Sequence, residues 1–221
     1  GNIWRSTDSG VTWTEITTTG EAKQWFGITM SSDGTKLAAV ARNGNIWTST
    51  DSGVTWTEDT SVGATKDWKG ITSTADGTKL AATVNNGNIW SSDDSGATWT
   101  EVTVGDGTNA WRGITFSADG TKLAAVVYGY NIWTKMETLI SGSSSEATPI
   151  DGTGAGATFN NPKGITIDST DTNLYVADTE NHLIRKIVIA TGEVTTIAGS
   201  GSDGFDNDAG IAATLNDLYD I

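Results

Sequence analysis

Residues 25–60 read WFGITMSSDGTKLAAVARNGNIWTSTDSGVTWTEDT, and this stretch decides the fold. It predicts four short strands, at Gly27–Ser31, Lys36–Ala41, Asn45–Thr50 and Val54–Glu58. The second strand is almost wholly apolar, as expected of a strand that is buried on both faces. Glycine-containing turns separate the strands, and Asn43-Gly44 is the pattern of a type I′ hairpin.

The same unit recurs along the chain with a step of 43 residues and no insertion. All ten Trp residues follow this step and fall into three columns. The columns are Trp4, Trp47, Trp90 and Trp133; Trp13, Trp56 and Trp99; and Trp25, Trp68 and Trp111. Four short strands in each unit of about 43 residues are typical of a propeller blade. We therefore predict an all-β fold, a β-propeller of four-stranded blades.

The turn before the fourth strand carries the pattern Ser-x-Asp-x-Gly-x-x-Trp in three copies. These copies are Ser6, Asp8, Gly10 and Trp13; Ser49, Asp51, Gly53 and Trp56; and Ser92, Asp94, Gly96 and Trp99. The carboxylate can accept hydrogen bonds from turn amides, and glycine supplies a positive φ. The pattern resembles the Asp-box, or BNR repeat, of sialidase-like and photosystem-assembly-like propellers, and the resemblance implies a structural role. A fourth copy has lost it, with Lys135, Glu137 and Leu139 at the key positions.

From about Met136 a second kind of repeat begins. Residues 159–168 (FNNPKGITID), 173–178 (NLYVAD), 181–187 (NHLIRKI) and 192–199 (GEVTTIAG) resemble an NHL repeat. The resemblance implies another four-stranded blade, with a structural network formed by Asp178, Asn181, His182 and Arg185. Residues 214–221 align with residues 158–165 and predict the start of a further blade.

We expect residues 1–221 to form a single propeller domain. Residues 1–135 would hold the Asp-box-type blades, and residues 136–221 the NHL-type blade and the start of the next. If the ring closes within the chain it has about five blades, the last incomplete, with Ile221 beginning the blade that Gly1–Thr17 finishes. Otherwise the chain is part of a larger ring. A start at Gly1, inside a repeat and without Met, indicates a processed, truncated or engineered piece.

Charge and composition exclude several classes of partner. Lys and Arg total 13 against 27 acidic residues, a net charge of −14, which repels phosphate backbones and anionic lipid. No run approaches the roughly 18 apolar residues that span a bilayer. We therefore expect no nucleic-acid partner and no membrane insertion. The absence of Cys excludes disulfides and thiolate metal sites.

The residue patterns of sialidase-type and zinc-dependent catalysis are missing. A sialidase-type site needs an arginine cluster, but Arg5, Arg42, Arg112 and Arg185 lie at different repeat positions. The lone His182 cannot supply the three ligands of a catalytic zinc site. We expect no enzyme activity and no cofactor. The one candidate for calcium is the oxygen-rich loop of Asp203, Asp206 and Asp208.

The column Trp25, Trp68 and Trp111 is the candidate ligand platform. Each ring stands just before a Gly-Ile-Thr at the entrance of the innermost strand, where equivalent rings could stack on sugars with avidity. The alternative is that these rings wedge between blades as core, the role we expect for Trp4, Trp13 and their repeats.

We predict a non-catalytic structural or protein-interaction module of an extracellular or cell-surface bacterial protein, with a protein or glycan surface as partner. Three alternatives stay open: a multivalent, lectin-like carbohydrate-binding propeller, a glycosidase-like fragment without its catalytic residues, and an engineered or chimeric propeller. Neither the ligand nor the oligomeric state follows from the sequence.

Overall fold

The computed structural model describes residues 1–221 except 105–108, 130, 135–137, 142–148, 205–207 and 217. Two compact units divide the chain, Gly1–Val102 and Thr103–Ile221. In the described residues both units consist of antiparallel strands and short 3-10 turns, which confirms the all-β prediction. The single-domain arrangement and the number of blades stay predictions.

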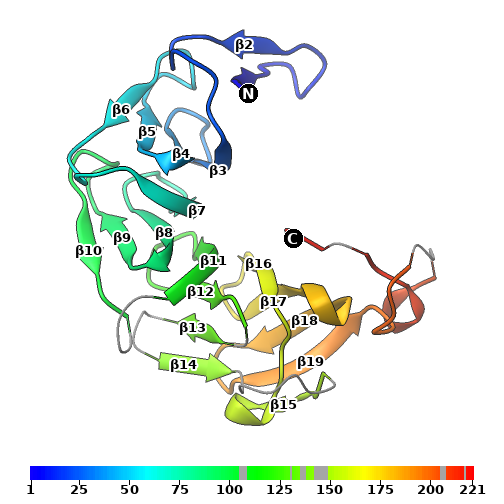
Figure 1. Ribbon diagram of the computed structural model, residues 1–221. Helices are drawn as coiled ribbons and strands as arrows, with labels where there is room; N and C mark the ends of the chain where they lie inside the picture. The colour runs from blue at the N-terminus through cyan, green and yellow to red at the C-terminus, as the bar shows by residue number, and fades with distance from the viewer. Residues whose placement is uncertain (105–108, 130, 135–137, 142–148, 205–207, 217) are drawn as a thin grey trace. The chain divides into compact units, whose positions relative to one another are not determined.

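The first unit contains a two-stranded hairpin and two four-stranded antiparallel sheets (Figure 1). The hairpin is β1 (Ile3–Arg5) and β2 (Thr14–Ile16); the first sheet is β3 (Trp25–Met30), β4 (Leu37–Gly44), β5 (Ile46–Ser49) and β6 (Thr57–Asp59); the second is β7 (Lys66–Ser73), β8 (Leu80–Gly87), β9 (Ile89–Ser92) and β10 (Thr100–Val102). Within each sheet, strands that follow one another in the chain pair with one another. Two strands from different sheets, β4 and β7, also pair at Arg42↔Asp67 and Gly44↔Lys66.

The fourth strand of the first sheet is shorter than the sequence predicts. The expected strand Val54–Glu58 is wrong at its start, because β6 begins only after Trp56. The amide of Thr55 donates to Asp51 Oδ1 at 2.9 Å, and Trp56 Nε1 donates to the Gly53 carbonyl at 3.2 Å. These hydrogen bonds hold the residues before β6 in the turn.

The turn between β4 and β5 also differs from the prediction. A type I′ turn needs a positive φ at both central residues, but of the pair only Asn43 has one, at 51°. The end of β4 pairs with Lys66 of β7 instead, and the Gly44 carbonyl accepts a hydrogen bond from Trp68 Nε1 at 3.1 Å. A Cβ at Gly44 would lie 3.1 Å from Ala41 Cβ, so close approach explains this glycine.

The inner strands of the two sheets supply the core of the first unit. The buried cluster consists of Ala38, Val40, Ile46, Val62, Trp68, Ile71, Leu80, Ala82 and Val84. Both inner strands, β4 and β8, combine adjacent alanines with larger apolar residues, and all of these side chains are buried or nearly so. A second cluster joins the β1–β2 hairpin to the first sheet through Ile3, Ile16, Ala39, Trp47 and Trp56.

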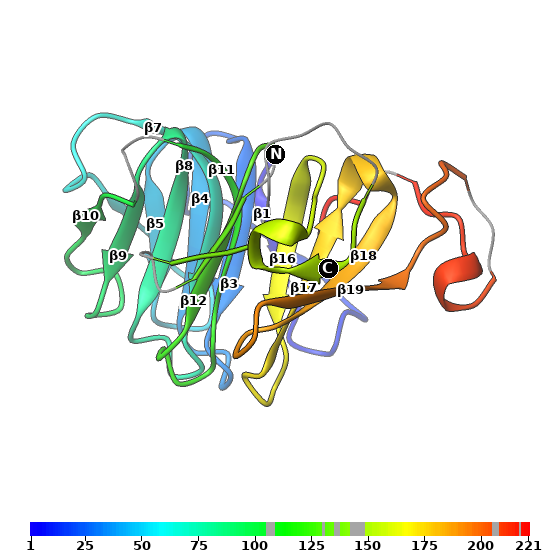
Figure 2. The same cartoon turned by 90° about the horizontal axis from the view of Figure 1, so that it is seen from below.

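The second unit contains one four-stranded and one five-stranded sheet. The strands are β11 (Asn109–Phe116), β12 (Leu123–Val127), β13 (Ile132–Thr134) and β14 (Thr138–Ser141), and then β15 (Gly152–Thr153), β16 (Pro162–Ile167), β17 (Asn173–Asp178), β18 (Leu183–Val188) and β19 (Glu193–Ala198). Strands β16 to β19 lie side by side in chain order, and the short β15 pairs with the outer edge of β19 (Figures 1 and 2). The buried core of the second unit includes Phe159, Ile165 and Leu174.

Glycines let the first strands of consecutive sheets approach closely. A Cβ at Gly27 would lie 3.4 Å from the backbone nitrogen of Ile71. In the second unit, a Cβ at Gly113 would lie 2.6 Å from the Lys163 carbonyl oxygen, and one at Gly164 would lie 2.6 Å from Asp220 Cα. The segment that ends at Ile221 therefore lies against β16 as β16 lies against β11.

The substitution Gly113→Ala tests this close approach. Backbone atoms occupy the place of the new methyl group, so we expect the free energy of unfolding to fall by about 1–3 kcal/mol. Gly156→Ala is the control, because no atom lies within 4 Å of that Cβ position, and it should stay within about 0.5 kcal/mol of the parent. Urea unfolding followed by Trp fluorescence measures both. Equal stability of the two variants would contradict the close approach.

Candidate functional site

The side chain of Arg185 is fully buried and joins three segments of the second unit. Its Nη1 donates to Asp178 Oδ2 at 3.0 Å and to the Thr158 carbonyl at 2.9 Å. Its Nη2 donates to the Ile150 carbonyl and to Asp151 Oδ1, both at 2.9 Å. One guanidinium thus ties strand β18 to the end of β17, to the residues just before β15 and to the loop before β16.

The Asp178 carboxylate is the second centre of this network. It accepts the Asn160 amide at 2.7 Å and Asn181 Nδ2 at 2.8 Å in addition to Arg185. Burial raises the pKa of Asp178 above its ordinary value, against the opposing effect of these donors. His182 ends the adjoining 3-10 turn with a left-handed φ of 54°. Asp178, Asn181 and Arg185 hydrogen-bond one another, whereas His182 Nδ1 is buried without a partner among the described residues.

Replacing Arg185 by Met should be strongly destabilising, because it leaves the Asp178 carboxylate buried without its cation. We expect a loss of about 3–5 kcal/mol in the free energy of unfolding. Lys186→Met on the same strand removes a less buried cation and serves as the control. Chemical denaturation of both variants measures the difference, and a mild effect of Arg185→Met would show that the network is dispensable.

The three Ser-x-Asp-x-Gly turns have the same internal hydrogen bonds. In the second copy, Ser49 Oγ accepts the Gly53 amide at 2.9 Å and donates to Asp51 Oδ1 at 2.9 Å. The Asp51 carboxylate also accepts the amide and the hydroxyl of Thr55, at 2.9 and 2.6 Å. Gly53 has a φ of 79°. Each carboxylate therefore accepts hydrogen bonds from residues of its own turn.

Six exposed carboxylates have the same lowered pKa for this reason. Hydrogen bonds from neighbouring hydroxyls and amides lower the pKa of each of them to about 2: Asp8, Asp33, Asp51, Asp76, Asp94 and Asp119. Three of them lie in the Ser-x-Asp-x-Gly turns, and three in the turns that follow the first strand of a sheet.

These pKa values predict how stability depends on pH. A carboxyl with a lowered folded-state pKa stabilises the fold above its unfolded value near 3.8, and this contribution is lost as the pH falls towards 2. We expect a flat free energy of unfolding above about pH 5 and a decline between about pH 4 and 2. Asp51→Asn should make the decline shallower. A decline of unchanged steepness would count against the turn as its source.

The three rings of the candidate ligand platform differ in exposure. Trp68 and Trp111 are fully buried, so they present no face to a ligand, and the platform interpretation does not hold for them. Trp25 is partly buried and meets the Trp47 ring edge-on, with centroids 6.1 Å apart. Of the three, only Trp25 retains some exposure.

The core expectation is wrong for Trp4 and Trp13. Their side chains are 53% and 58% exposed, whereas the next copies, Trp47 and Trp56, are buried. The later pair packs on Ile3 of the β1–β2 hairpin. Trp4 and Trp13 belong to the hairpin itself and join no core cluster of the described residues.

A cation–aromatic pair follows the Trp column in successive repeats. Each strand has an irregular register just after the column position. The next side chain is exposed at Phe26 but only 12% exposed at Lys69. The pairs are Lys69 Nζ over Phe26 at 4.5 Å, Arg112 Cζ over Tyr128 at 5.0 Å and Lys163 Nζ over Tyr219 at 3.7 Å. These pairs were not predicted from the sequence, although the aligned series Phe26, Lys69, Arg112 and Lys163 is visible in it.

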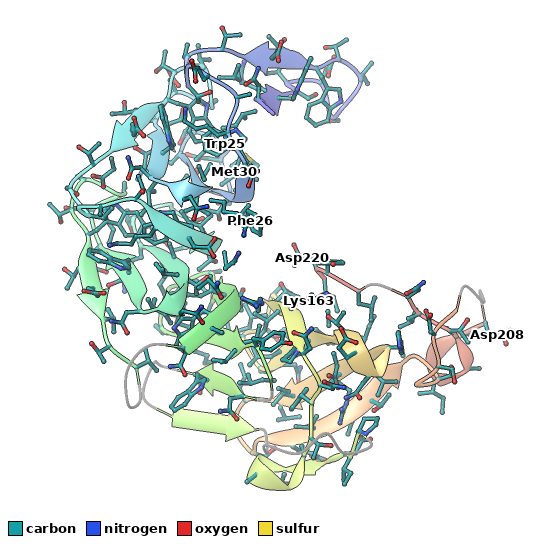
Figure 3. All side chains as sticks on the ribbon, viewed as in Figure 1. Trp25, Phe26, Met30, Lys163, Asp208 and Asp220 are labelled. Carbon is teal, nitrogen blue, oxygen red and sulfur yellow. The ribbon has the colours of Figure 1, made fainter. Side chains whose placement is uncertain are left out.

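The first of these pairs belongs to a larger group, the Phe26 cluster, made of Phe26, Arg42, Asp67 and Lys69. The Phe26 ring is 47% exposed, and Arg42 Cζ lies 5.8 Å from its centroid (Figure 3). Asp67 Oδ1 lies 3.1 Å from Lys69 Nζ and 3.3 Å from Arg42 Nε. Partial burial works to raise the pKa of Asp67, but the hydrogen bonds of Asn85 and Lys69 and the two cations hold it below its ordinary value. With two cations and one anion, the cluster carries a net positive charge in a chain of −14.

Within the described part of the chain, no group of three or more His, Cys, Asp or Glu is placed to hold a metal ion. Of the calcium candidates, Asp206 lies outside the described residues, whereas Asp203 and Asp208 lie within them. The described residues also contain no helix long and apolar enough to cross a membrane.

A scan against protein-family models matches the NHL repeat over residues 159–187, which confirms this part of the sequence prediction. The chain is 41% identical over 83 residues to "Protein SUPPRESSOR OF QUENCHING 1, chloroplastic" of Arabidopsis thaliana, and 48% identical over 60 residues to "NHL repeat-containing protein 2" of Homo sapiens. These matches cover 36% and 27% of this chain but only 8% of either relative.

Solved β-propellers resemble this chain over most of its length. An auxiliary nutrient binding protein from Bacteroides ovatus gives a TM-score of 0.71 at 18% identity over 95% of this chain and 56% of that one. Its counterpart from Bacteroides thetaiotaomicron gives 0.68 at 20% identity, over 89% and 53%. YCF48 bound to D1 peptide gives 0.57 at 17% identity, over 89% and 61%. The fold is therefore that of a β-propeller, as predicted.

Proposed function

We propose that the chain is a non-catalytic interaction module that binds a carboxylate-bearing protein segment at the Phe26 cluster. The observation that carries the proposal is an exposed aromatic ring contacted by two cations, Arg42 and Lys69, on a chain of net charge −14. Exposed aromatic and arginine side chains are the residue types that dominate binding energy at protein interfaces. The net negative charge of the chain disfavours anionic partners in general, so a locally positive cluster is a favourable place for them to bind.

The structural networks support the non-catalytic part of the proposal. We infer that the Ser-x-Asp-x-Gly turns are Asp-boxes with a structural role, because their carboxylates accept hydrogen bonds from residues of the same turn. Arg185 and Asp178 are bound to each other in the same way. One propeller neighbour, YCF48, was solved bound to D1 peptide and is a precedent for peptide binding by this fold. The bacterial, extracellular location stays a prediction.

The carbohydrate-binding alternative receives less support from the geometry. A sugar platform needs rings with an open face, and Trp68 and Trp111 are fully buried. Only Trp25 of that column could contribute, so the avidity of equivalent sites would be lost. The glycosidase-fragment and chimera alternatives stay open.

The proposal is tested with a short fluorescein-labelled peptide of alternating Glu and Phe, and with the same peptide carrying Gln in place of Glu. We expect the acidic peptide alone to bind, with an affinity that falls as the salt concentration rises. Phe26→Ala and Arg42→Gln should each weaken binding by about tenfold or more. Fluorescence anisotropy measures the affinities.

Lys186→Gln is the matched control, because it changes the net charge as Arg42→Gln does but lies in the second unit. It should bind the acidic peptide as the parent chain does. If Lys186→Gln weakens binding as much as Arg42→Gln, the attraction is a general charge effect and the Phe26 cluster is not the site.

A further inference from the structure

Lys66, the first residue of β7, carries a cation without a counterion. Its Nζ lies 4.8 Å from the centroid of the Trp90 ring, and both side chains are partly buried. In the part of the chain that the structure describes, this ammonium group forms no ion pair and no side-chain hydrogen bond. An ammonium group has three donors, and a ring that covers one side of it leaves the others free for an anion.

The preceding repeat shows the same cation–ring pair with its donors occupied. Lys23 stands 43 residues before Lys66, and its Nζ lies 4.8 Å from the centroid of the Trp47 ring. That Nζ also donates to the carbonyls of Thr19 at 2.8 Å and Glu21 at 3.2 Å. No described carbonyl accepts a hydrogen bond from Lys66 in this way. The same ammonium group is thus satisfied in one repeat and open to a ligand in the next.

Lys66 lies at the same end of the first unit as the Phe26 cluster. The first two residues of β7 pair with β4 of the neighbouring sheet, at Gly44↔Lys66 and Arg42↔Asp67 (Figure 1). Lys69 of the cluster is three residues further along β7, which corresponds to about 10 Å in an extended strand. All of these residues belong to the first unit.

The two positive positions are separate from each other. Asp67 lies between them in the chain, and its carboxylate pairs with Lys69 and Arg42 but not with Lys66 in the described structure. A charge-assisted hydrogen bond from an ammonium group to a carboxylate is only about 2.7–2.9 Å long. One carboxylate therefore cannot bind at Lys69 and at Lys66 together, and a ligand that uses both positions needs two.

We propose that Lys66 over Trp90 is a second subsite for the partner of the Phe26 cluster, and that this partner is an extended segment with two acidic residues three positions apart. The inference rests on the proposed function, because it assigns a further contact to the same partner. One carboxylate binds at the Phe26 cluster and the other at Lys66. The second contact forms within the complex, so its high effective concentration raises the affinity beyond that of either contact alone.

Three fluorescein-labelled peptides of equal length test the spacing. The first carries a single Glu beside a Phe, the second adds another Glu three positions away, and the third adds it directly next to the first Glu. The second and third peptides therefore have the same charge. We expect the spaced peptide to bind the parent chain about tenfold more tightly than the adjacent one, as measured by fluorescence anisotropy.

Variants of the chain assign the effect to Lys66. Lys66→Gln should lower the affinity for the spaced peptide to that for the single-Glu peptide, which itself should not change. Lys66→Arg keeps the charge and should keep the preference for the spaced peptide. Lys79→Gln is the matched control, because it removes a cation from the same sheet beyond the opposite end of β7, which is Ser73. This control should also keep the preference.

Three results would overturn the second subsite and leave the proposed function in place. The first is equal binding of the spaced and adjacent peptides by the parent chain. The second is a preference that survives Lys66→Gln. The third is a preference that Lys79→Gln removes as well, which would make it a general charge effect. If no acidic peptide binds the parent chain, the proposed function itself fails, and the second subsite fails with it.

Discussion

The close approach of first strands at glycine is the contact on which the rest of the structure depends. At Gly27, Gly113 and Gly164 the missing side chain admits the backbone or the isoleucine of the segment that lies against it. Because the strands meet at this distance, the neighbouring positions must be small, and the alanines of β4 and β8 meet that demand. The largest buried side chain, Trp68, lies beside the Gly44 carbonyl and donates a hydrogen bond to it, and the Ser-x-Asp-x-Gly turns are closed by their own hydrogen bonds.

Much of this architecture could be predicted from the sequence, because its determinants are local or repeat strictly. The apolar run around Val40 predicts a buried strand, and the 43-residue spacing of the Trp residues gives the length of one repeat. The NHL triplet at Asn181 identified a different kind of sheet without tertiary information. What could not be predicted depends on contacts between sheets. From the sequence, the Asn43-Gly44 pair predicts a type I′ turn. In the structure β4 extends to Gly44 and pairs with β7, and the glycine is needed there for close packing.

The same limit applies to the candidate site. Identical sequence positions differ in exposure because they meet different neighbours: Trp13 and Trp56 share one motif, yet only Trp56 packs against another hairpin. The Phe26 cluster lies where the register is irregular, just after Trp25 and Trp68, and this irregularity has no sequence signal of its own. Aligning the residues after the Trp column would have shown the basic series, but not that an aromatic ring lies beneath each cation.

The uniform 43-residue repeat allows such a chain to evolve by duplication or loss of whole repeats. The residues that meet at Gly27 and Ile71 recur 43 positions later as Gly70 and Ile114. An in-register duplication or loss of one repeat therefore keeps the same residue types at each junction. The junction with the NHL repeat has the same kind of contact, because the Lys163 carbonyl of that repeat lies close to Gly113 of the preceding sheet. Repeats from different families can therefore stand next to each other in one chain, provided that their first strands keep this glycine.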